Sequence, residues 1–189
     1  MEIIKSHPAP DILVVNLWGG KSVGKSTIMA GLYWELRRRG LSAAMVPGEK
    51  WLEGDKTALL KFAEAHHEIS SHRGTHEIII TDFPLPLGIY YDKTKSINFR
   101  ALVMESWKEI TNLNFYIERD PGSKVPEEWL QMDKDLKNIL VSSSFPFTPV
   151  PSRDPLPIIL DTISEYRTRE KLKKEDGGEE NYNLDSPEE

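Results

Sequence analysis

The possible folds of this chain are constrained most by one stretch of sequence. It consists of a short apolar run, a glycine-rich loop and an amphipathic segment in direct succession. Residues 12–18 read ILVVNLW, a nearly continuous apolar run followed by glycines, which is typical of a strand buried on both faces. Beyond the glycines, residues 26–39 place Ile28, Leu32 and Leu36 on one helical stripe. A buried strand, a glycine loop and a helix in direct succession predict the first unit of a parallel sheet.

The same alternation continues along the chain. The further predicted strands are 42–46, 77–81, 114–117 and, more weakly, 147–150. The further predicted helices are about 55–70, 96–111, 127–141 and 155–174. A proline- and tyrosine-rich stretch, DFPLPLGIYYDKTK, is expected to form a loop. The pattern predicts an α/β fold with a five-stranded, mostly parallel sheet and helices on both faces.

The length and the charge distribution predict one folded domain with a tail. The chain has 189 residues, 39% of them hydrophobic, which is enough for one sizeable core. Residues 175–189 contain seven acidic residues and no Lys or Arg, so the 24 basic and 23 acidic residues of 1–174 nearly balance. We therefore predict a domain over 1–174 and a disordered acidic tail over 175–189. A nearly neutral domain leaves a nucleic-acid partner possible despite the net charge of -6.

Several classes of protein are excluded by what the sequence lacks. Without cysteine there is no disulfide, thiolate–zinc site, iron–sulfur cluster or cysteine nucleophile. No apolar stretch approaches the roughly 18 residues that span a bilayer, and the start, MEIIKSHPAPD, does not resemble a secretory signal. We expect a cytoplasmic protein with no membrane partner.

The glycine loop carries the strongest functional motif. GGKSVGKST matches G-x-x-x-x-G-K-[ST] through Gly19, Gly24, Lys25 and Ser26, in the strand–loop–helix setting that this Walker A motif requires. Backbone amides of such a loop surround phosphates, the lysine reaches the outer phosphates, and the serine hydroxyl ligates magnesium. We predict that ATP and Mg²⁺ are bound by the loop residues Gly19, Gly20, Lys21, Ser22, Val23, Gly24, Lys25, Ser26 and Thr27.

Two carboxylates follow predicted strands at the edge where parallel sheets bind ligands. Asp82 ends the apolar run EIIIT, a Walker B position, where it can hold magnesium together with Ser26 or act on an acceptor hydroxyl. Glu49 follows the second strand and is a candidate base for the same hydroxyl. Trp51 either stacks on a base or sugar of the acceptor or is buried. The alternatives are turn chemistry for Asp82 and a solvated loop for Glu49.

Phosphoryl transfer also needs cations that stabilise charge in the transition state. Arg119, directly after the fourth strand, is the best-placed candidate, and Lys124 is a weaker one. Arg73 and Arg100 are candidates for contact with an acceptor phosphate. The alternative for each is an ordinary solvated charge.

Taken together, several segments resemble the P-loop kinases encoded by tailed bacteriophages, including the 5-hydroxymethyluridine DNA kinases. The resemblance covers roughly residues 11–165 and is carried by LVVNLWGGKSVGKST, GLYWELRRRG, Glu49, ITDFPLPLGIYY and NFYIERD. It implies a kinase-type P-loop NTPase fold, in which the Walker A and Walker B strands are adjacent. The chain departs from the family pattern at Phe83, where many members have serine, and in the segment ERDPGSKVPEE, which lacks a second lid arginine.

The resemblance implies that the chain transfers the γ-phosphoryl group of ATP to 5-hydroxymethyluracil in phage DNA, within an infected bacterial host. Lys25, Asp82, Glu49 and Arg119 are then the catalytic candidates, and Ser26 and Asp82 the magnesium ligands. Two alternatives stay open. One is a kinase of free nucleosides or nucleotides, and the other is an ATPase regulated by a partner protein, without an acceptor.

Overall fold

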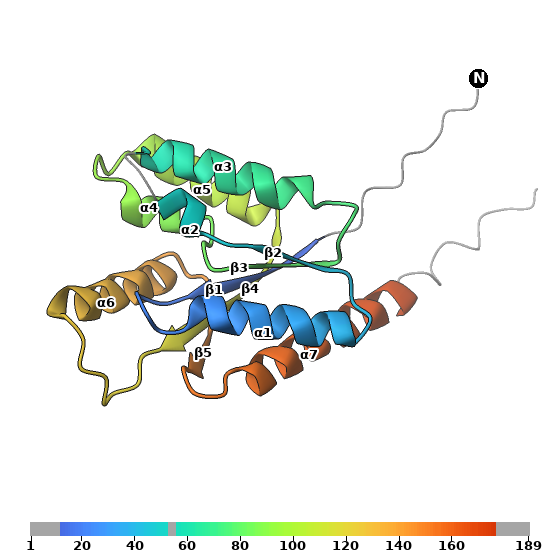
Figure 1. Cartoon of the computed structure of the whole chain (residues 1–189). Helices are drawn as coiled ribbons and strands as arrows, with labels where there is room; N and C mark the ends of the chain where they lie inside the picture. The colour runs from blue at the N-terminus through green and yellow to red at the C-terminus, as the bar shows by residue number, and fades with distance from the viewer. Residues whose placement is uncertain (1–11, 53–55, 177–189) are drawn as a thin grey trace, which may run out of the picture.

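Five parallel strands form the centre of the computed structural model, which describes residues 12–52 and 56–176 (Figure 1). The strands are β1 (Leu13–Trp18), β2 (Ala43–Val46), β3 (Ile78–Thr81), β4 (Thr111–Glu118) and β5 (Thr148–Pro151). Their order in the sheet is β2-β3-β1-β4-β5, and every pairing is parallel. The predicted α/β class and five-stranded sheet are confirmed, and the sheet is parallel throughout rather than mostly parallel.

Helices connect the strands, as the sequence predicts, but two of them are additional. The helices are α1 (Lys25–Arg38), α2 (Glu49–Leu52), α3 (Ala58–Ser71), α4 (Leu87–Tyr91), α5 (Ile97–Lys108), α6 (Glu127–Ser142) and α7 (Leu156–Asp176). The short helices α2 and α4 fall in segments expected to be loops. In α4 the turns are closed by hydrogen bonds to the carbonyls of Pro84 and Pro86, and Leu85 and Leu87 are buried.

The fourth strand begins earlier than the sequence predicts. The prediction extends the preceding helix to 111 and begins the strand at 114, whereas α5 ends at Lys108 and β4 begins at Thr111. Residues 111–113 pair with residues 13–15 of β1 in register. β1 therefore pairs with β4 from its first residue through residue 116, and sheet pairing overrides local helix propensity at the start of the strand.

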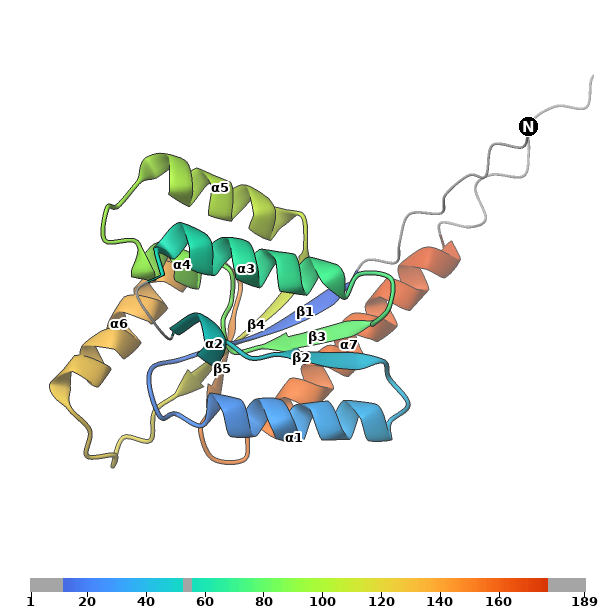
Figure 2. The ribbon, with the colours of Figure 1, turned by 45° about the horizontal axis from the view of Figure 1, so that its top comes forward.

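Helices cover both faces of the sheet, because side chains alternate between its faces along each strand. On one face Val15 and Leu17 pack with the buried stripes of α1 and α7. On the other face Val14 and Trp18 pack with α3, α5 and α6 (Figure 2). Since all strands run the same way, the loops that follow β1, β2, β3 and β4 lie at one edge of the sheet, its carboxyl edge.

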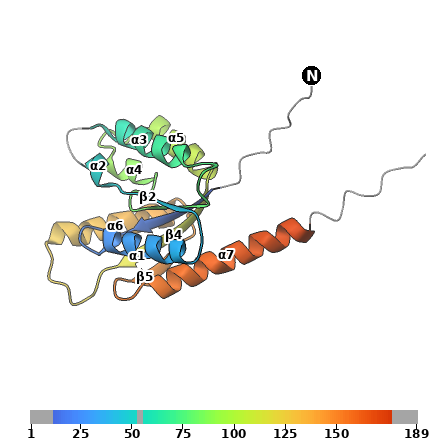
Figure 3. The same cartoon turned by 45° about the vertical axis from the view of Figure 1, so that its right-hand side comes forward.

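The last helix reaches past the predicted end of the domain. Figure 3 shows the final turns of α7 projecting beyond the other described elements, and their residues are exposed. Glu175 and Asp176 belong to this helix, whereas the rest of the predicted acidic tail, 177–189, lies outside the described residues, as does the predicted start of the second helix at 55. Within the described ranges, no helix combines the length and apolar character needed to cross a membrane.

Replacing Leu32 with alanine tests how strongly α1 depends on its sheet-facing side. Leu32 has no exposed surface, so Leu32→Ala leaves a cavity and is expected to lower the free energy of unfolding by about 2–5 kcal/mol. Trp34 lies on the same helix with 67% of its surface exposed, and Trp34→Ala should change stability by no more than about 0.5 kcal/mol. Urea unfolding measures both variants, and equal effects would contradict the assigned burial.

Candidate active site

The glycine loop leaves β1 and turns into α1 at the carboxyl edge of the sheet. Gly24 precedes α1 with a φ of +92°, a left-handed conformation that glycine adopts without strain. Among the described residues, the amides of Ser22 and Val23 donate to no hydrogen-bond acceptor. Val23 buries its side chain in the core, whereas Lys21, Ser22, Ser26 and Thr27 are exposed. The loop therefore presents backbone N–H groups at the positive end of a helix, an arrangement suited to anions.

Lys25 reaches back over the loop from the first turn of α1. Its ammonium donates to the carbonyl oxygens of Gly19 at 2.8 Å and Gly20 at 2.7 Å. Burial lowers the pKa of Lys25 from its ordinary value, and the carboxylates of Asp82 and Asp133 oppose that shift. A partly buried cation held over free amide groups adds to the positive character of the loop.

The carboxylate of Asp82 joins the ends of three neighbouring strands. Its Oδ2 accepts a hydrogen bond from the Ser26 hydroxyl at 3.1 Å, and its Oδ1 accepts from the Gly48 amide at 2.7 Å. Ser26 follows β1, Gly48 follows β2 and Asp82 follows β3. The predicted pairing of Ser26 with Asp82 is thus present in the geometry.

Ser26 and Asp82 also fit a magnesium ion. They place a hydroxyl and a carboxylate oxygen, both hard donors, at one point beside the loop. No group of three or more Asp, Glu or His able to hold a metal occurs in the described part of the chain. Magnesium usually takes only one or two protein ligands and completes its shell with phosphate oxygens and water, so two donors suffice.

The backbone at Gly48 approaches Phe83 closely, and this approach allows the Gly48 amide to donate to Asp82. A Cβ at residue 48 would lie 2.5 Å from the Cβ of Phe83, closer than side chains pack. Phe83 itself is buried, and its amide donates to the Thr81 hydroxyl. Only glycine at 48 therefore lets the end of β2 approach Phe83, the residue after Asp82.

Arg119 lies against the loop, held by a carboxylate that the sequence analysis does not single out. Its Nε donates to Asp133 Oδ2 at 2.7 Å and its Nη2 to the Lys21 carbonyl at 2.8 Å. Asp133, on α6, also accepts from the Gly20 amide at 2.9 Å. The Arg119 and Asp133 side chains are only 9% and 15% exposed. The guanidinium is therefore fixed beside the loop, and its action on a phosphoryl group stays a prediction.

Asp133 leaves a readable signal in the sequence. It lies on the inward stripe of α6 that Trp129, Leu136 and Leu140 form at spacings of four, three and four residues. A carboxylate on an apolar helical stripe requires a buried partner, here Arg119. The sequence pattern could have located Asp133, although not the partner.

Glu49 and Trp51, which the sequence places near the site, differ in their exposure to solvent. Glu49 is the first residue of α2, exposed, and adjoins Gly48 and hence Asp82. Trp51 is 2% exposed and packs edge-on against Phe83, with ring centroids 5.2 Å apart. Stacking of Trp51 on a base or sugar is therefore wrong, because the ring belongs to the core.

The remaining predicted cations are not assembled at the loop. Arg73 precedes β3 at the opposite edge of the sheet and donates to the Glu109 carbonyl at 3.4 Å. Arg100, on α5, donates to the Ser143 hydroxyl at 3.3 Å. Lys124 is exposed in the connection between β4 and α6. Arg73 therefore lies at the edge of the sheet opposite the glycine loop, and its contact with an acceptor phosphate stays a prediction.

No protein-family model matches the chain, and no curated protein matches its sequence at a significant level.

Loss of Asp133 tests the buried ion pair beside the loop. Asp133→Ala leaves the Arg119 guanidinium desolvated and unpaired, so the free energy of unfolding should fall by about 3 kcal/mol. Asp135, two residues further along α6 and bonded to Gln131, provides a matched carboxylate, and Asp135→Ala should cost less than about 1 kcal/mol. Thermal and urea unfolding compare the two, and a loss no larger in Asp133→Ala would refute the stabilising pair.

Proposed function

We propose that this chain is a kinase with a P-loop NTPase fold, which transfers the γ-phosphoryl group of ATP to the hydroxyl of a modified pyrimidine, 5-hydroxymethyluracil, in DNA. The observation that carries the proposal is the hydrogen bond between Ser26 and Asp82, beside a loop in which the amides of Ser22 and Val23 donate to no acceptor among the described residues. It supports a joint binding place for triphosphate and metal at the carboxyl edge of the sheet.

The strand order supports the kinase type of this fold. β1, which leads into the glycine loop, is the direct neighbour of β3, which leads into Asp82. This is the adjacency of Walker A and Walker B strands that the resemblance to kinases implies. Because β1 and β3 are neighbours, Asp82 after β3 and the glycine loop after β1 lie next to each other, with no strand between them.

In the proposed reaction the acceptor oxygen attacks the γ-phosphorus, the bond from that phosphorus to the β,γ-bridging oxygen breaks, and ADP leaves with the electron pair. The hydroxyl proton passes to a carboxylate, for which Asp82 and the adjoining Glu49 are the candidates. Lys25 and the loop amides hold the phosphate oxygens, and Arg119 counters charge at the same loop. Magnesium, bound at Ser26 and Asp82, would neutralise charge on the phosphates.

Label transfer from γ-labelled ATP tests the proposal. Incubated with the full chain and magnesium, an oligonucleotide containing 5-hydroxymethyluracil should acquire label on that base, whereas the same strand with thymine should not. Asp82→Asn and Lys25→Ala should each lower the rate about a hundredfold or more, because each removes a group that acts in the transition state.

Lys108→Ala, an exposed lysine near the end of α5, is the charge-matched control and should retain the rate. ATP hydrolysis without label in any acceptor would instead favour a partner-regulated ATPase. Label in free nucleosides alone would favour a small-molecule kinase.

A further inference from the structure

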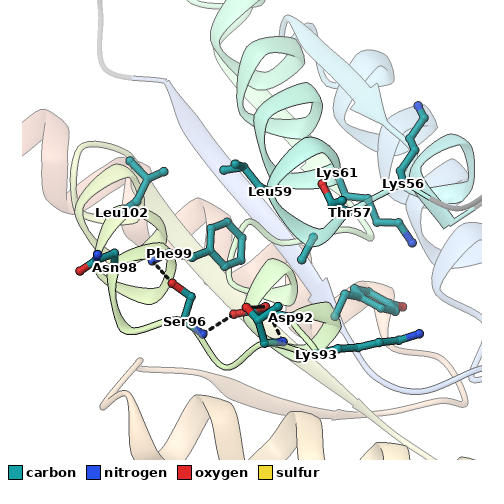
Figure 4. A pocket seen from close by; sticks show the side chains of 13 residues that line it. Lys56, Thr57, Leu59, Lys61, Asp92, Lys93, Ser96, Asn98, Phe99 and Leu102 are labelled. Carbon is teal, nitrogen blue, oxygen red and sulfur yellow. Dashed lines mark hydrogen bonds between the residues drawn. The ribbon is translucent and has the colours of Figure 1, made fainter.

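A pocket of about 810 Å³ has a lining that includes neither Asp82 nor any residue of the glycine loop (Figure 4). It opens between the first turn of α3, the connection from α4 to α5, and α5 itself. Tyr91, at the end of α4, forms part of its wall. The Tyr91 ring stacks on Phe83, with centroids 5.9 Å apart and planes 5° apart. Phe83 follows Asp82 directly in the chain, so Tyr91 connects this wall to the residue next to the carboxylate of the proposed reaction.

One end of the pocket carries a buried cation without an anionic partner. Lys61 is only 9% exposed, and its ammonium lies 5.0 Å from the centroid of the Tyr91 ring. Within the described ranges it forms no hydrogen bond or ion pair. Lys56, by contrast, pairs with Glu64 at 2.6 Å. A desolvated charge without a partner is costly, so its retention points to a ligand that supplies the opposite charge.

Other positive charge gathers at the same place. Figure 4 shows the side chains of Lys61 and Lys93 extending toward the same end of the pocket. The helix α3 begins at the pocket and has no acidic residue in its first turn. The carboxylate of Asp92 is engaged by the amides of Thr94 at 2.9 Å and Ser96 at 2.7 Å. Among the described residues, neither Lys61 nor Lys93 forms an ion pair with Asp92 or with another acid, so this end of the pocket suits a phosphate.

The opposite end of the pocket is apolar and faces outward. Figure 4 places Leu59, Phe99 and Leu102 together, away from the lysine ammonium groups. Leu59 and Leu102 are 54% and 43% exposed and both line the pocket, so they form an apolar patch that a ligand can cover. Phe99 contributes a ring that is braced edge-on by Phe62, at 5.7 Å between centroids. Such a surface suits the face of a nucleobase.

The order of these features outward from Asp82 matches a polynucleotide strand better than a single nucleotide. At the cationic end Lys61 lies against Tyr91, which stacks on Phe83, the residue after Asp82, whereas the other end carries the exposed Leu59 and Leu102. A strand whose reactive base lies at Asp82 presents next a backbone phosphate and then a neighbouring base. A free nucleoside has no phosphate for the lysines, and a free mononucleotide has no second base.

We propose that this pocket is the subsite for the acceptor strand, in which Lys61 and Lys93 bind the phosphate next to the reactive nucleotide, and Phe99, Leu59 and Leu102 contact the neighbouring base. The inference rests on the proposed function, since it concerns the acceptor of that reaction. It makes single-stranded DNA, rather than a nucleoside, the form in which the acceptor is bound.

Strand binding in the absence of ATP tests the subsite. The probe is a fluorescein-labelled five-nucleotide strand with 5-hydroxymethyluracil at its centre, and its dissociation constant for the full chain is measured by anisotropy. A second probe carries neutral methylphosphonate at the two linkages flanking the centre. The wild-type chain should bind the natural strand about tenfold more tightly than the neutral one, because the lysine–phosphate contact is charge-assisted.

Lys61→Met keeps the length of the side chain and removes its charge. It should weaken binding of the natural strand about tenfold, leave binding of the neutral strand unchanged, and reduce the slope of binding against salt by about 0.7. Its melting temperature should be equal to or above that of the wild type, since a buried unpaired charge is removed. Lys108→Met, with the same change in net charge, should bind like the wild type.

Equal affinity of the wild-type chain for the charged and neutral strands would overturn the subsite, whether or not any variant folds. Equal weakening of both strands by Lys61→Met, or a free mononucleotide that binds as tightly as the strand, would overturn it as well. These outcomes are separable from the proposed function, because they involve no phosphoryl transfer. A chain that binds the strand through Lys61 yet labels no acceptor would reject the proposed function alone.

Discussion

The carboxylate of Asp82 joins parts of the chain that are far apart in sequence. One oxygen accepts from Ser26 at the start of α1 and the other from the Gly48 amide at the end of β2. Since β2, β3 and β1 are consecutive in the sheet, this one group sets how their carboxyl ends meet. Ser26, beside the glycine loop, contacts Asp82 directly. Glu49, the first residue of α2, is next to Gly48, and Tyr91 in the pocket wall stacks on Phe83, the residue after Asp82. The absence of a side chain at residue 48 is the steric condition for this arrangement.

Charge at this edge is balanced by a second carboxylate. Asp133 accepts hydrogen bonds from the Arg119 guanidinium and from the Gly20 amide. One amide of the loop and the neighbouring guanidinium are therefore already hydrogen-bonded within the protein. The two carboxylates raise the pKa of Lys25 against the larger effect of burial, which lowers it. The protein's own acids therefore hold Arg119 beside the loop and favour the charged form of Lys25.

The strands and the main helices were predictable from the sequence because their signals are local. An apolar run of six residues and a stripe at helical spacing report burial directly, as β1 and α1 show. The helices α2 and α4 were missed because each has only a turn or so of sequence, and prolines in the segment around α4 are typical of loops. The start of β4 was misplaced because its first residues depend on β1 for their pairing.

The candidate site was predictable to the extent that its residues follow strands. Lys25, Ser26, Asp82, Glu49 and Arg119 all lie at the carboxyl edge, as parallel strands require. Their partners were not predictable, because Asp133 and Gly48 become neighbours only through tertiary packing. For Trp51 the sequence left stacking on a ligand and burial as alternatives, because an aromatic residue near a site can equally pack in the core, where the structure places it. The buried position of Lys61 likewise follows from the approach of α3 to α4 rather than from any motif.

The central claim is that the backbone around residues 19–27 seats a nucleotide's polyphosphate. Amide resonances of the ¹⁵N-labelled full chain, followed by nuclear magnetic resonance during titration with magnesium and ATP, report on it most directly. The largest shifts should fall on the amides of residues 20–27, and the Lys25→Ala chain should lose them. A spectrum that stays unchanged at millimolar nucleotide, or whose main shifts fall at the opposite edge around residues 74–77, would contradict it.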